Sequence, residues 1–433
     1  MKKLSKSILA FLMISTLLFS CILSGCSQNN DNSQINNNQL SIYLLKDDEI
    51  SPLVKNFNKF QEDIEIKISE FENTEVLFTK LQTEMMAGKG PDLIYYNYNT
   101  NNQNMIKYID NDMFTDLNEL MKNDISEDKL IMGEYNQTVV KSGVYDNKQY
   151  FMPLTYLVNS FVTTQENCLN YKIDMSDGFS FDTLDQRLSV FLNDDKNKSI
   201  CTSLPYTLFF EKFIEEEVDN KGEKFNFETP EFENTFSSIE KSYITCDVNE
   251  NYDAFQEMAD GNLLFLGSGY FSGNPYVSVM EADEFYKYNM TPKILSYSRD
   301  SNSFDSYVGS FLAINSNSNK KQSAYEFIKF SLDYKQQMVL ETNDIPVNNT
   351  AFKKYVEKAE KYIESNDEHQ DVMASFLKSY LDNIEKVNKC RLNNYYYYEN
   401  ILAPTLSDYL NKTMDYDDFI SSLTNKTRLY FDE

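Results

Sequence analysis

Short apolar runs alternate with helical patterns early in the chain, and this alternation restricts the folds that the chain can adopt. Apolar residues at every second position mark strands, and apolar residues three and four apart mark helices. The expected elements are, in order, a strand at 40–45, a helix at 51–60, a strand at 64–68, a helix at 76–87 and a strand at 92–96. Strands that alternate with helices of this length predict a mainly parallel sheet with helices on both faces.

The later part of the chain continues this pattern less regularly. The expected elements are an extended crossover at 150–162, a strand at 262–266 that leads into a glycine turn, a strand at 311–315, a helix at 319–340 and a helical remainder. In sheets of this kind ligands bind beyond the carboxyl ends of the strands. The exit of the third strand, at Tyr95, Tyr96 and Asn97, is therefore a candidate site.

The length and the charge of the chain limit its organisation and its partners. A chain of 433 residues exceeds what one hydrophobic core usually serves, so we expect two lobes. The formal net charge at pH 7 is −27. Such an acidic protein repels nucleic acid and anionic lipid headgroups, so neither is an expected partner. Solubility explains the acidity better than the steering of a substrate does.

The N-terminus has the layout of a secretory signal. Lys2, Lys3 and Lys6 precede an apolar stretch at 8–25. This stretch ends in Leu-Ser-Gly before Cys26, which resembles a bacterial lipobox. The resemblance implies a signal peptide at 1–25 and lipidation of Cys26. A transmembrane helix is the alternative, but no stop-transfer charge follows the stretch. The Asn/Gln-rich segment at 26–39 is then expected to be a lipid-anchored tether.

Several catalytic chemistries are excluded by residue types that are scarce or poorly spaced. His369 is the only histidine, and its polar surroundings predict a solvated side chain, so Ser-His, Cys-His and most zinc systems are not expected. No Cys-x-x-Cys motif occurs, and no metal or cofactor is expected. Four cysteines remain beyond the tether, at 168, 201, 246 and 390. Disulfide bonds and buried free thiols are the two alternatives for these four cysteines.

One segment resembles a known family. Residues 86–96, Met-Ala-Gly-Lys-Gly-Pro-Asp-Leu-Ile-Tyr-Tyr, look like the A-G-x-x-P-D-hydrophobic signature of family 1 extracellular solute-binding proteins, the sugar-binding receptors of ABC importers. The turn at 88–92 itself is expected to be architectural. Similar landmarks recur in order at 116–117, 148–153, 260–265, 324–330 and 345–347, ahead of a helical tail.

The resemblance implies an α/β fold of the two-lobed periplasmic-binding-protein type, in which each lobe is a mainly parallel sheet flanked by helices. Lobe one is expected at 40–153 and 311–345, and lobe two at 154–310 and 346–433. The ligand would bind between the lobes and close the hinge. The family further implies a monomer on the outer face of the cytoplasmic membrane, with permease subunits of an ABC transporter as partners.

The maltodextrin-binding branch of the family supplies candidate ligand contacts. Tyr96 is similar in position to a stacking aromatic of that branch, and Asn99 stands where the branch keeps a hydroxyl-binding Asp. The other contacts that the resemblance implies are Tyr206, Tyr270, and Tyr396 or Tyr397. Aromatic rings suit sugars because the C–H faces of a sugar ring are apolar. The 31 tyrosines and the absence of tryptophan, however, also fit a codon bias.

Position alone adds further candidates. Tyr156 and Tyr307 flank the two expected crossovers and are candidate ligand contacts. Asp47 and Asp48 follow the first strand, where they would accept sugar hydroxyls or, as we favour, cap the next helix.

Together these observations predict a receptor that binds a sugar or an oligosaccharide without chemistry and delivers it to a permease. A secreted carbohydrate hydrolase is one alternative, which needs two carboxylates about 5 to 9.5 Å apart, and no local motif supports such a pair. A receptor that senses ligand for a membrane signalling partner is the other. It would use the same fold, so the sequence does not separate it from an importer subunit.

Overall fold

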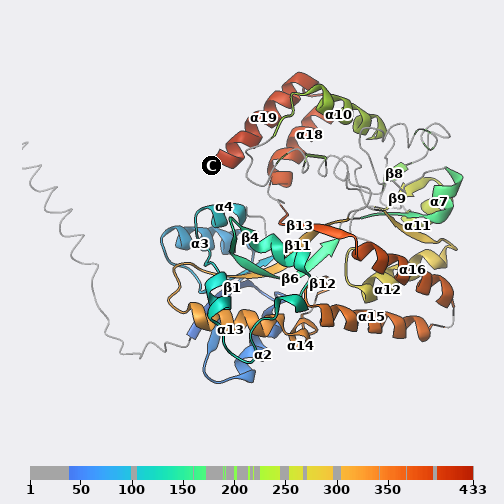
Figure 1. The fold of residues 1–433 in the computed structure, drawn as a ribbon. Helices are drawn as coiled ribbons and strands as arrows, with labels where there is room; N and C mark the ends of the chain where they lie inside the picture. Colours follow the sequence, from blue (N-terminus) through green and yellow to red (C-terminus); the bar gives the residue numbers. More distant parts are fainter. Residues whose placement is uncertain are drawn as a thin grey trace, which may run out of the picture. The chain divides into compact units, whose positions relative to one another are not determined.

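A computed structural model (Figure 1) describes most of the chain from residue 39 onward. The described residues are 39–98, 105–158, 160–171, 189, 191, 199–201, 213–214, 218, 225–243, 253–266, 271–295, 304–340, 342–366, 368–393 and 397–432.

A seven-stranded sheet organises this part of the chain. Its strands are β1 (Gln39–Leu45), β2 (Glu65–Phe71), β3 (Leu93–Asn97), β6 (Phe151–Val158), β11 (Phe304–Ile314), β12 (Ile345–Pro346) and β13 (Val387–Arg391). The order is β12-β6-β11-β3-β1-β2, and β13 pairs with the beginning of β11. β1 runs parallel to β2 and to β3, whereas β11 runs antiparallel to β3 and to β6. The sheet is therefore mixed rather than mainly parallel.

The first five elements follow the expected order. Helix α2 (Ser51–Phe60) lies between β1 and β2, and α3 (Thr74–Met86) lies between β2 and β3. The predicted architectural turn is present two residues after the end of α3. Gly88 and Gly90 adopt positive φ angles of 71° and 101°, which glycine tolerates best. Asp92 then accepts hydrogen bonds from Ser41 and Ser318, so it ties β1 and the segment after β11 to the start of β3.

The two faces of the sheet are covered by different apolar clusters. On β3, Leu93 and Tyr95 join the largest cluster, which includes Phe57 of α2 and Phe327 of α13 (Lys321–Leu332). Ile94 and Tyr96 join a second cluster, under α3, together with Leu81 of that helix. This alternation follows from the two-residue period of a strand. We name these clusters the central cluster and the α3 cluster.

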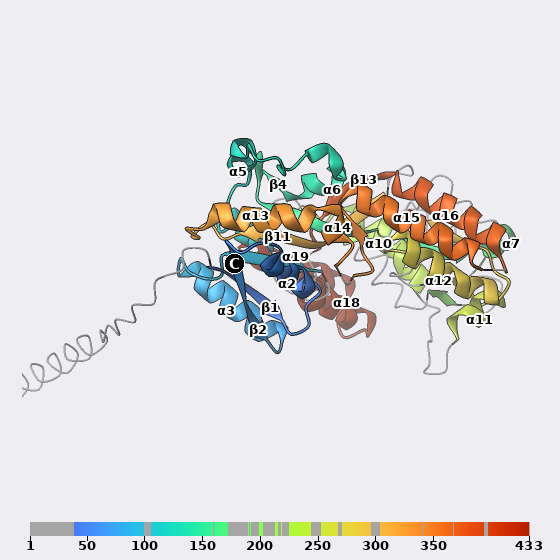
Figure 2. The same cartoon turned by 90° about the horizontal axis from the view of Figure 1, so that it is seen from below.

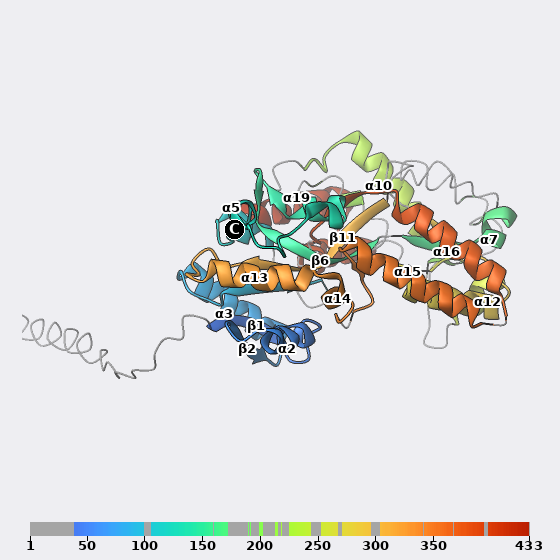
Figure 3. The same ribbon diagram turned by 60° about the horizontal axis from the view of Figure 1, so that its bottom comes forward.

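Helices dominate the second half of the chain. Those described, in addition to α13, are α10 (Pro230–Tyr243), α11 (Ala254–Ala259), α12 (Pro275–Lys287), α14 (Tyr334–Gln337), α15 (Asn349–Glu364), α16 (Gln370–Ile384), α18 (Ala403–Leu410) and α19 (Tyr416–Asp432), with a π-helical turn η4 (Tyr398–Leu402). Figures 2 and 3 show α12, α15 and α16 side by side, and all three contribute to the central cluster. α10, α18 and α19 share a separate apolar cluster rich in aromatic rings, which we name the aromatic cluster.

Shorter elements complete the described fold. They are α4 (Met105–Asp110), α5 (Asn118–Asn123), η1 (Met132–Glu134), α6 (Gln137–Val140), η2 (Lys141–Gly143), β4 (Val144–Tyr145), β5 (Lys148–Gln149), β7 (Phe161–Thr164), α7 (Gln165–Asn170), β8 (Ser199–Cys201), β9 (Leu263–Phe265) and β10 (Pro292–Leu295). β7 pairs with β10, and β8 pairs with β9. Within the described ranges, no helix has the length and apolar character needed to cross a bilayer.

Candidate functional site

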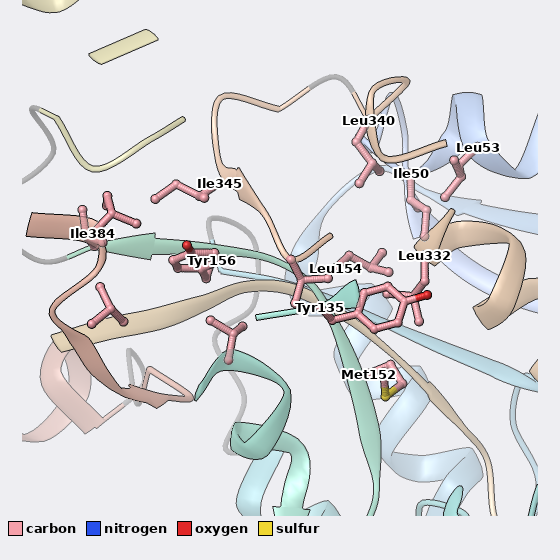
Figure 4. Packing of buried hydrophobic residues seen from close by; sticks show 14 of the residues in the cluster. Ile50, Leu53, Tyr135, Met152, Leu154, Tyr156, Leu332, Leu340, Ile345 and Ile384 are labelled. Carbon is pink, nitrogen blue, oxygen red and sulfur yellow. The ribbon is translucent and has the colours of Figure 1, made fainter. Parts of the chain in front are cut away.

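Polar side chains from five segments meet near the carboxyl ends of β1 and β3. They come from the loop after β1, from β3, from β6, from β11 and from the segment just before β12. We name this group the crossover cluster, and its members are Asp48, Glu49, Tyr95, Asn97, Thr155, Ser310, Thr342 and Asp344. The cluster lies next to apolar residues of β6 and β12, such as Tyr156 and Ile345, that Figure 4 shows in the central cluster.

The first half of the crossover cluster joins β3 to the loop after β1. The side-chain amide of Asn97 donates a hydrogen bond to Glu49 Oε2 at 3.0 Å and another to the Tyr95 hydroxyl at 3.5 Å. Asp48 accepts from the backbone N–H of Leu45 at 3.3 Å, which closes the turn after β1. The expectation that Asp48 caps the next helix is wrong, because Ile50 occupies the N-cap of α2 and no side chain caps it.

The second half joins the three neighbouring strands β6, β11 and β12. The Thr155 hydroxyl donates to Asp344 Oδ2 at 2.8 Å and lies 2.9 Å from the Ser310 hydroxyl. Thr342 Oγ1 accepts the backbone N–H of Asp344 at 3.2 Å. The side-chain hydrogen bonds therefore form two neighbouring groups, one of Asn97 with Glu49 and Tyr95 and one of Thr155 with Ser310 and Asp344.

A glycine in β11 makes this close approach possible. The pairing of β11 with β6 shifts register on either side of Ser310, so the strand is bulged there. A Cβ added to Gly309 would lie 2.3 Å from Asp344 Oδ2 and 2.6 Å from Thr155 Oγ1. Any side chain at residue 309 would thus displace the bond between Thr155 and Asp344.

Burial disfavours the charged forms of the acids in the cluster. Desolvation raises the pKa of Asp48 to about 6, although hydrogen bonds from the backbone N–H groups of Leu45 and Glu49 act to lower it. It raises the pKa of Glu49 to about 7, with help from the nearby charges of Asp344 and Asp48. Burial also raises the pKa of Asp344. In the described part of the chain no Lys or Arg forms an ion pair with these three acids, so they accept hydrogen bonds only from neutral donors.

The described tyrosines among the predicted ligand contacts lie in different apolar surroundings. Tyr96 is 2% exposed, belongs to the α3 cluster and stacks on Phe311. Tyr156 lies in the central cluster, where its hydroxyl accepts from Asn136. Tyr397 lies in the aromatic cluster and is hydrogen-bonded to Thr427. Tyr307 is buried on β11, paired with Arg391 of β13. The structure does not bring these four together, and a ligand contact at each stays a prediction.

The remaining predicted positions lie outside the described residues. They are Cys26, Asn99, Tyr206, Tyr270 and Tyr396. Of the cysteines, Cys168 and Cys390 are free thiols. His369 is exposed, as expected, and its ring lies against Tyr286 at the start of α16. Among the residues described, no set of three or more His, Cys, Asp or Glu is arranged to hold a metal ion.

Most of the crossover cluster escaped the sequence analysis. Thr155, Ser310, Thr342 and Asp344 are ordinary residue types with no motif around them, and only the pairing of distant strands brings them together. The feature of the sequence that could have located these residues is the set of expected crossovers between the lobes. These crossovers, at 153–154, 310–311 and 345–346, each lie within a residue or two of a cluster member.

Comparison with known proteins agrees with this architecture of a binding protein. Residues 52–364 match the family model of bacterial extracellular solute-binding proteins. The chain belongs to this family, whose members bind solutes and are not enzymes. No curated protein matches the chain in sequence.

Several solved structures share the fold at low sequence identity. An ABC substrate-binding protein from Listeria monocytogenes in complex with cycloalternan is 12% identical, with a TM-score of 0.58, and the match covers 90% of this chain and 98% of that chain. An oligosaccharide periplasmic-binding protein from Synechococcus is 15% identical, with a TM-score of 0.61 and coverage of 91% and 99%. A cyclic maltosyl-maltose binding protein from Arthrobacter globiformis is 14% identical, with a TM-score of 0.57 and coverage of 91% and 98%. The predicted periplasmic-binding-protein-like fold is confirmed.

Proposed function

We propose that this protein is a lipid-anchored extracellular receptor that captures a neutral sugar or oligosaccharide and delivers it to the permease of an ABC transporter. The observation that carries the proposal is the family match over residues 52–364. It gains support from similar structures whose ligands are cycloalternan and cyclic maltosyl-maltose.

The chemistry of the crossover cluster suits a hydroxyl-rich ligand. Asp48 and Glu49 are half-buried at the carboxyl end of β1, where family folds of this type bind ligand. Carboxyl oxygens accept hydrogen bonds from sugar hydroxyls, and a neutral ligand needs no compensating cation. An anionic ligand would meet three acids at this edge of the sheet, so we expect acidic sugars to bind more weakly than neutral ones.

The proposed lobes are those expected from the sequence, with crossovers in β6, in β11 and at β12. Ligand would bind between residues 40–153 with 311–345 on one side and 154–310 with 346–433 on the other. The two lobes close around the ligand if the ligand contacts both of them better in the closed state than in the open state.

The proposed anchor is the acylated Cys26. Replacing Cys26 with Ala is expected to move the protein from the membrane fraction of the producing cells to the soluble fraction. Fractionation followed by immunoblotting measures this. A C26A protein that stayed with the membrane would point to the alternative of a spanning N-terminal helix.

A thermal-shift panel tests the ligand class. The full chain, in mild detergent, is heated with neutral oligosaccharides, acidic sugars, amino acids and short peptides. A ligand that binds only the folded state raises the unfolding temperature, by an amount that grows with its concentration over its dissociation constant. We expect neutral oligosaccharides to give the largest shift. A shift with peptides and none with sugars would overturn the sugar assignment, and turnover of an oligosaccharide would overturn the receptor.

A further inference from the structure

Lys107 of α4 and Tyr430 of α19 are in contact, although they belong to distant parts of the chain. The Lys107 Nζ atom lies over the Tyr430 ring, 5.2 Å from the ring centroid. Figure 1 shows the C-terminal end of α19 close to α4. A cation within about 6 Å of the centroid is attracted by the negative face of an aromatic ring. The contact is therefore a favourable cation–π pair.

Each member of this pair is held by its own surroundings. Ile106 and Tyr108, the neighbours of Lys107 on α4, are buried in the α3 cluster. Tyr430 is 7% exposed and belongs to the aromatic cluster, with Phe419 of the same helix. The pair therefore joins two parts of the molecule that have separate apolar cores.

The ring of Tyr430 also contacts a predicted ligand residue. Its centroid lies 5.5 Å from that of Tyr397, and the Tyr397 hydroxyl lies 2.8 Å from Thr427 Oγ1 of α19. The Tyr397 side chain is thus fixed to the same helix that carries Tyr430. A movement of α19 away from Lys107 would therefore move Tyr397 as well.

We propose that Lys107 and Tyr430 form a clasp, which holds the two lobes together in the absence of ligand and separates when they open. The proposal rests on the lobes of the proposed function, which place Lys107 in 40–153 and Tyr430 in 346–433. Neither residue lies on the crossover strands β6, β11 and β12. A rotation of one lobe about these strands therefore changes the distance between Lys107 and Tyr430.

The clasp shifts the equilibrium between the two arrangements of the lobes. A contact that exists in only one arrangement favours that arrangement by the interaction free energy of the contact. Lys107 is half-buried, and a cation–π pair that is partly exposed is expected to favour the clasped arrangement about 2- to 5-fold. A ligand that stacks on Tyr397 would then bind an arrangement that the clasp already favours.

The distance between two spin labels tests the clasp without any ligand. The labels are attached to non-natural amino acids at Gln82 of α3 and Ser421 of α19, both exposed, so that the cysteines stay unaltered. Pulsed electron resonance on the full chain in mild detergent gives the distribution of distances. We expect a main distance and a smaller population at longer distances. Lys107→Gln should raise the smaller population about 2- to 5-fold.

Conservative variants separate the clasp from a general effect of substitution. Lys107→Arg keeps the cation and Tyr430→Phe keeps the ring, so both should give the distances of the unaltered chain. Tyr430→Leu removes the ring and should behave as Lys107→Gln does. Lys358→Gln is the matched control, because Lys358 lies 4.9 Å over the ring of Tyr355 within the single helix α15. It should leave the distances unchanged.

Two results would overturn the clasp. One is a distribution for Lys107→Gln equal to that of the unaltered chain. The other is a double variant, Lys107→Gln with Tyr430→Leu, that opens more than either single variant, because one contact cannot be lost twice. A sugar panel without any shift would remove the sugar assignment, whereas longer distances in Lys107→Gln would still support the clasp.

Discussion

The ring of Tyr96 on β3 stacks on the ring of Phe311 on β11, with centroids 4.8 Å apart and planes 7° from parallel. The two residues are also register partners across the antiparallel pair of strands. Cross-strand aromatic pairs of this kind stabilise a sheet. In this conformation Tyr96 therefore contributes to the fold of the sheet, whereas the sequence had singled it out for a ligand.

Truncation of Tyr96 is expected to weaken folding. Tyr96→Ala removes a buried ring and should lower the free energy of unfolding by about 3–5 kcal/mol, measured by urea denaturation. Tyr96→Phe keeps the stacked ring and should cost much less. If Tyr96→Ala instead left stability unchanged and weakened sugar binding, the ring would belong to the ligand site after all.

The buried Lys329 is expected to be essential to stability. Its side chain is 3% exposed and contacts Glu326 at 2.8 Å, Asp128 at 3.0 Å and the buried Asp124 at 3.3 Å. Lys329→Met would leave Asp124 buried without its cation, which costs about 3–5 kcal/mol. Urea denaturation measures the loss. Lys354→Met, which breaks only the exposed pair with Glu357, is the matched control and should leave the midpoint unchanged.

Gly309 should not tolerate a side chain. Its Ala variant would place a methyl group against Asp344 and Thr155, and overpacking of this kind costs about 1–3 kcal/mol. We expect a lower unfolding temperature for Gly309→Ala. Gly133→Ala, where nothing lies within 4 Å of the added Cβ, is the control. Equal unfolding temperatures for the two variants would mean that the bulge in β11 adjusts at little cost.

Glu281 on α12 is expected to make the stability of the folded protein depend on pH. It accepts the backbone N–H of Phe271 at 2.6 Å, and Phe271 has an unusual positive φ of 57°. Burial raises the pKa of Glu281 from 4.5 to about 7. The folded protein thus holds a proton that the unfolded chain releases, so this residue's contribution to stability falls as the pH rises from about 4.5 to about 7 and is constant above that.

Replacing Glu281 with Gln should remove that contribution. The stability of Glu281→Gln relative to the unaltered chain is expected to rise by about 2–3 kcal/mol between pH 5 and pH 8. Thermal unfolding across this range gives the comparison. Glu284→Gln, at an exposed position of the same helix, should show no such trend.

The sequence predicted the regular elements well where their pattern was local. The expected helix at 76–87 is α3 at Thr74–Met86, and the expected strand at 262–266 contains β9. β11 begins at Phe304, seven residues before the expected strand, and the five-residue β13 was missed. The sequence Val-Asn-Lys-Cys-Arg of β13 has no apolar alternation, because this strand is mostly exposed or half-buried.

The site was harder to predict because side chains alternate between the two faces of a strand, and this alternation decides which of them meet. Tyr95 and Asn97 point to the same side of β3 and enter the crossover cluster, whereas Tyr96 points to the opposite side. A comparison of motifs selected Tyr96 by its residue type. The side of β3 that carries the cluster faces Glu49 of the loop after β1 and lies beside Ser310 of β11, which is more than 200 residues further along the chain, and no local pattern contains that information.

Because β11 lies between β3 and β6, the pairing of β3 is completed only late in the synthesis of the chain. β3 has β1 on one side, but its other side is completed only by a strand that follows it by roughly 200 residues. Until residue 314 has been made, the nascent chain holds Leu93–Asn97 as an unpaired, strongly apolar edge that other chains could pair with. Contacts this distant form slowly. The growing chain therefore needs protection from aggregation over about half of its length.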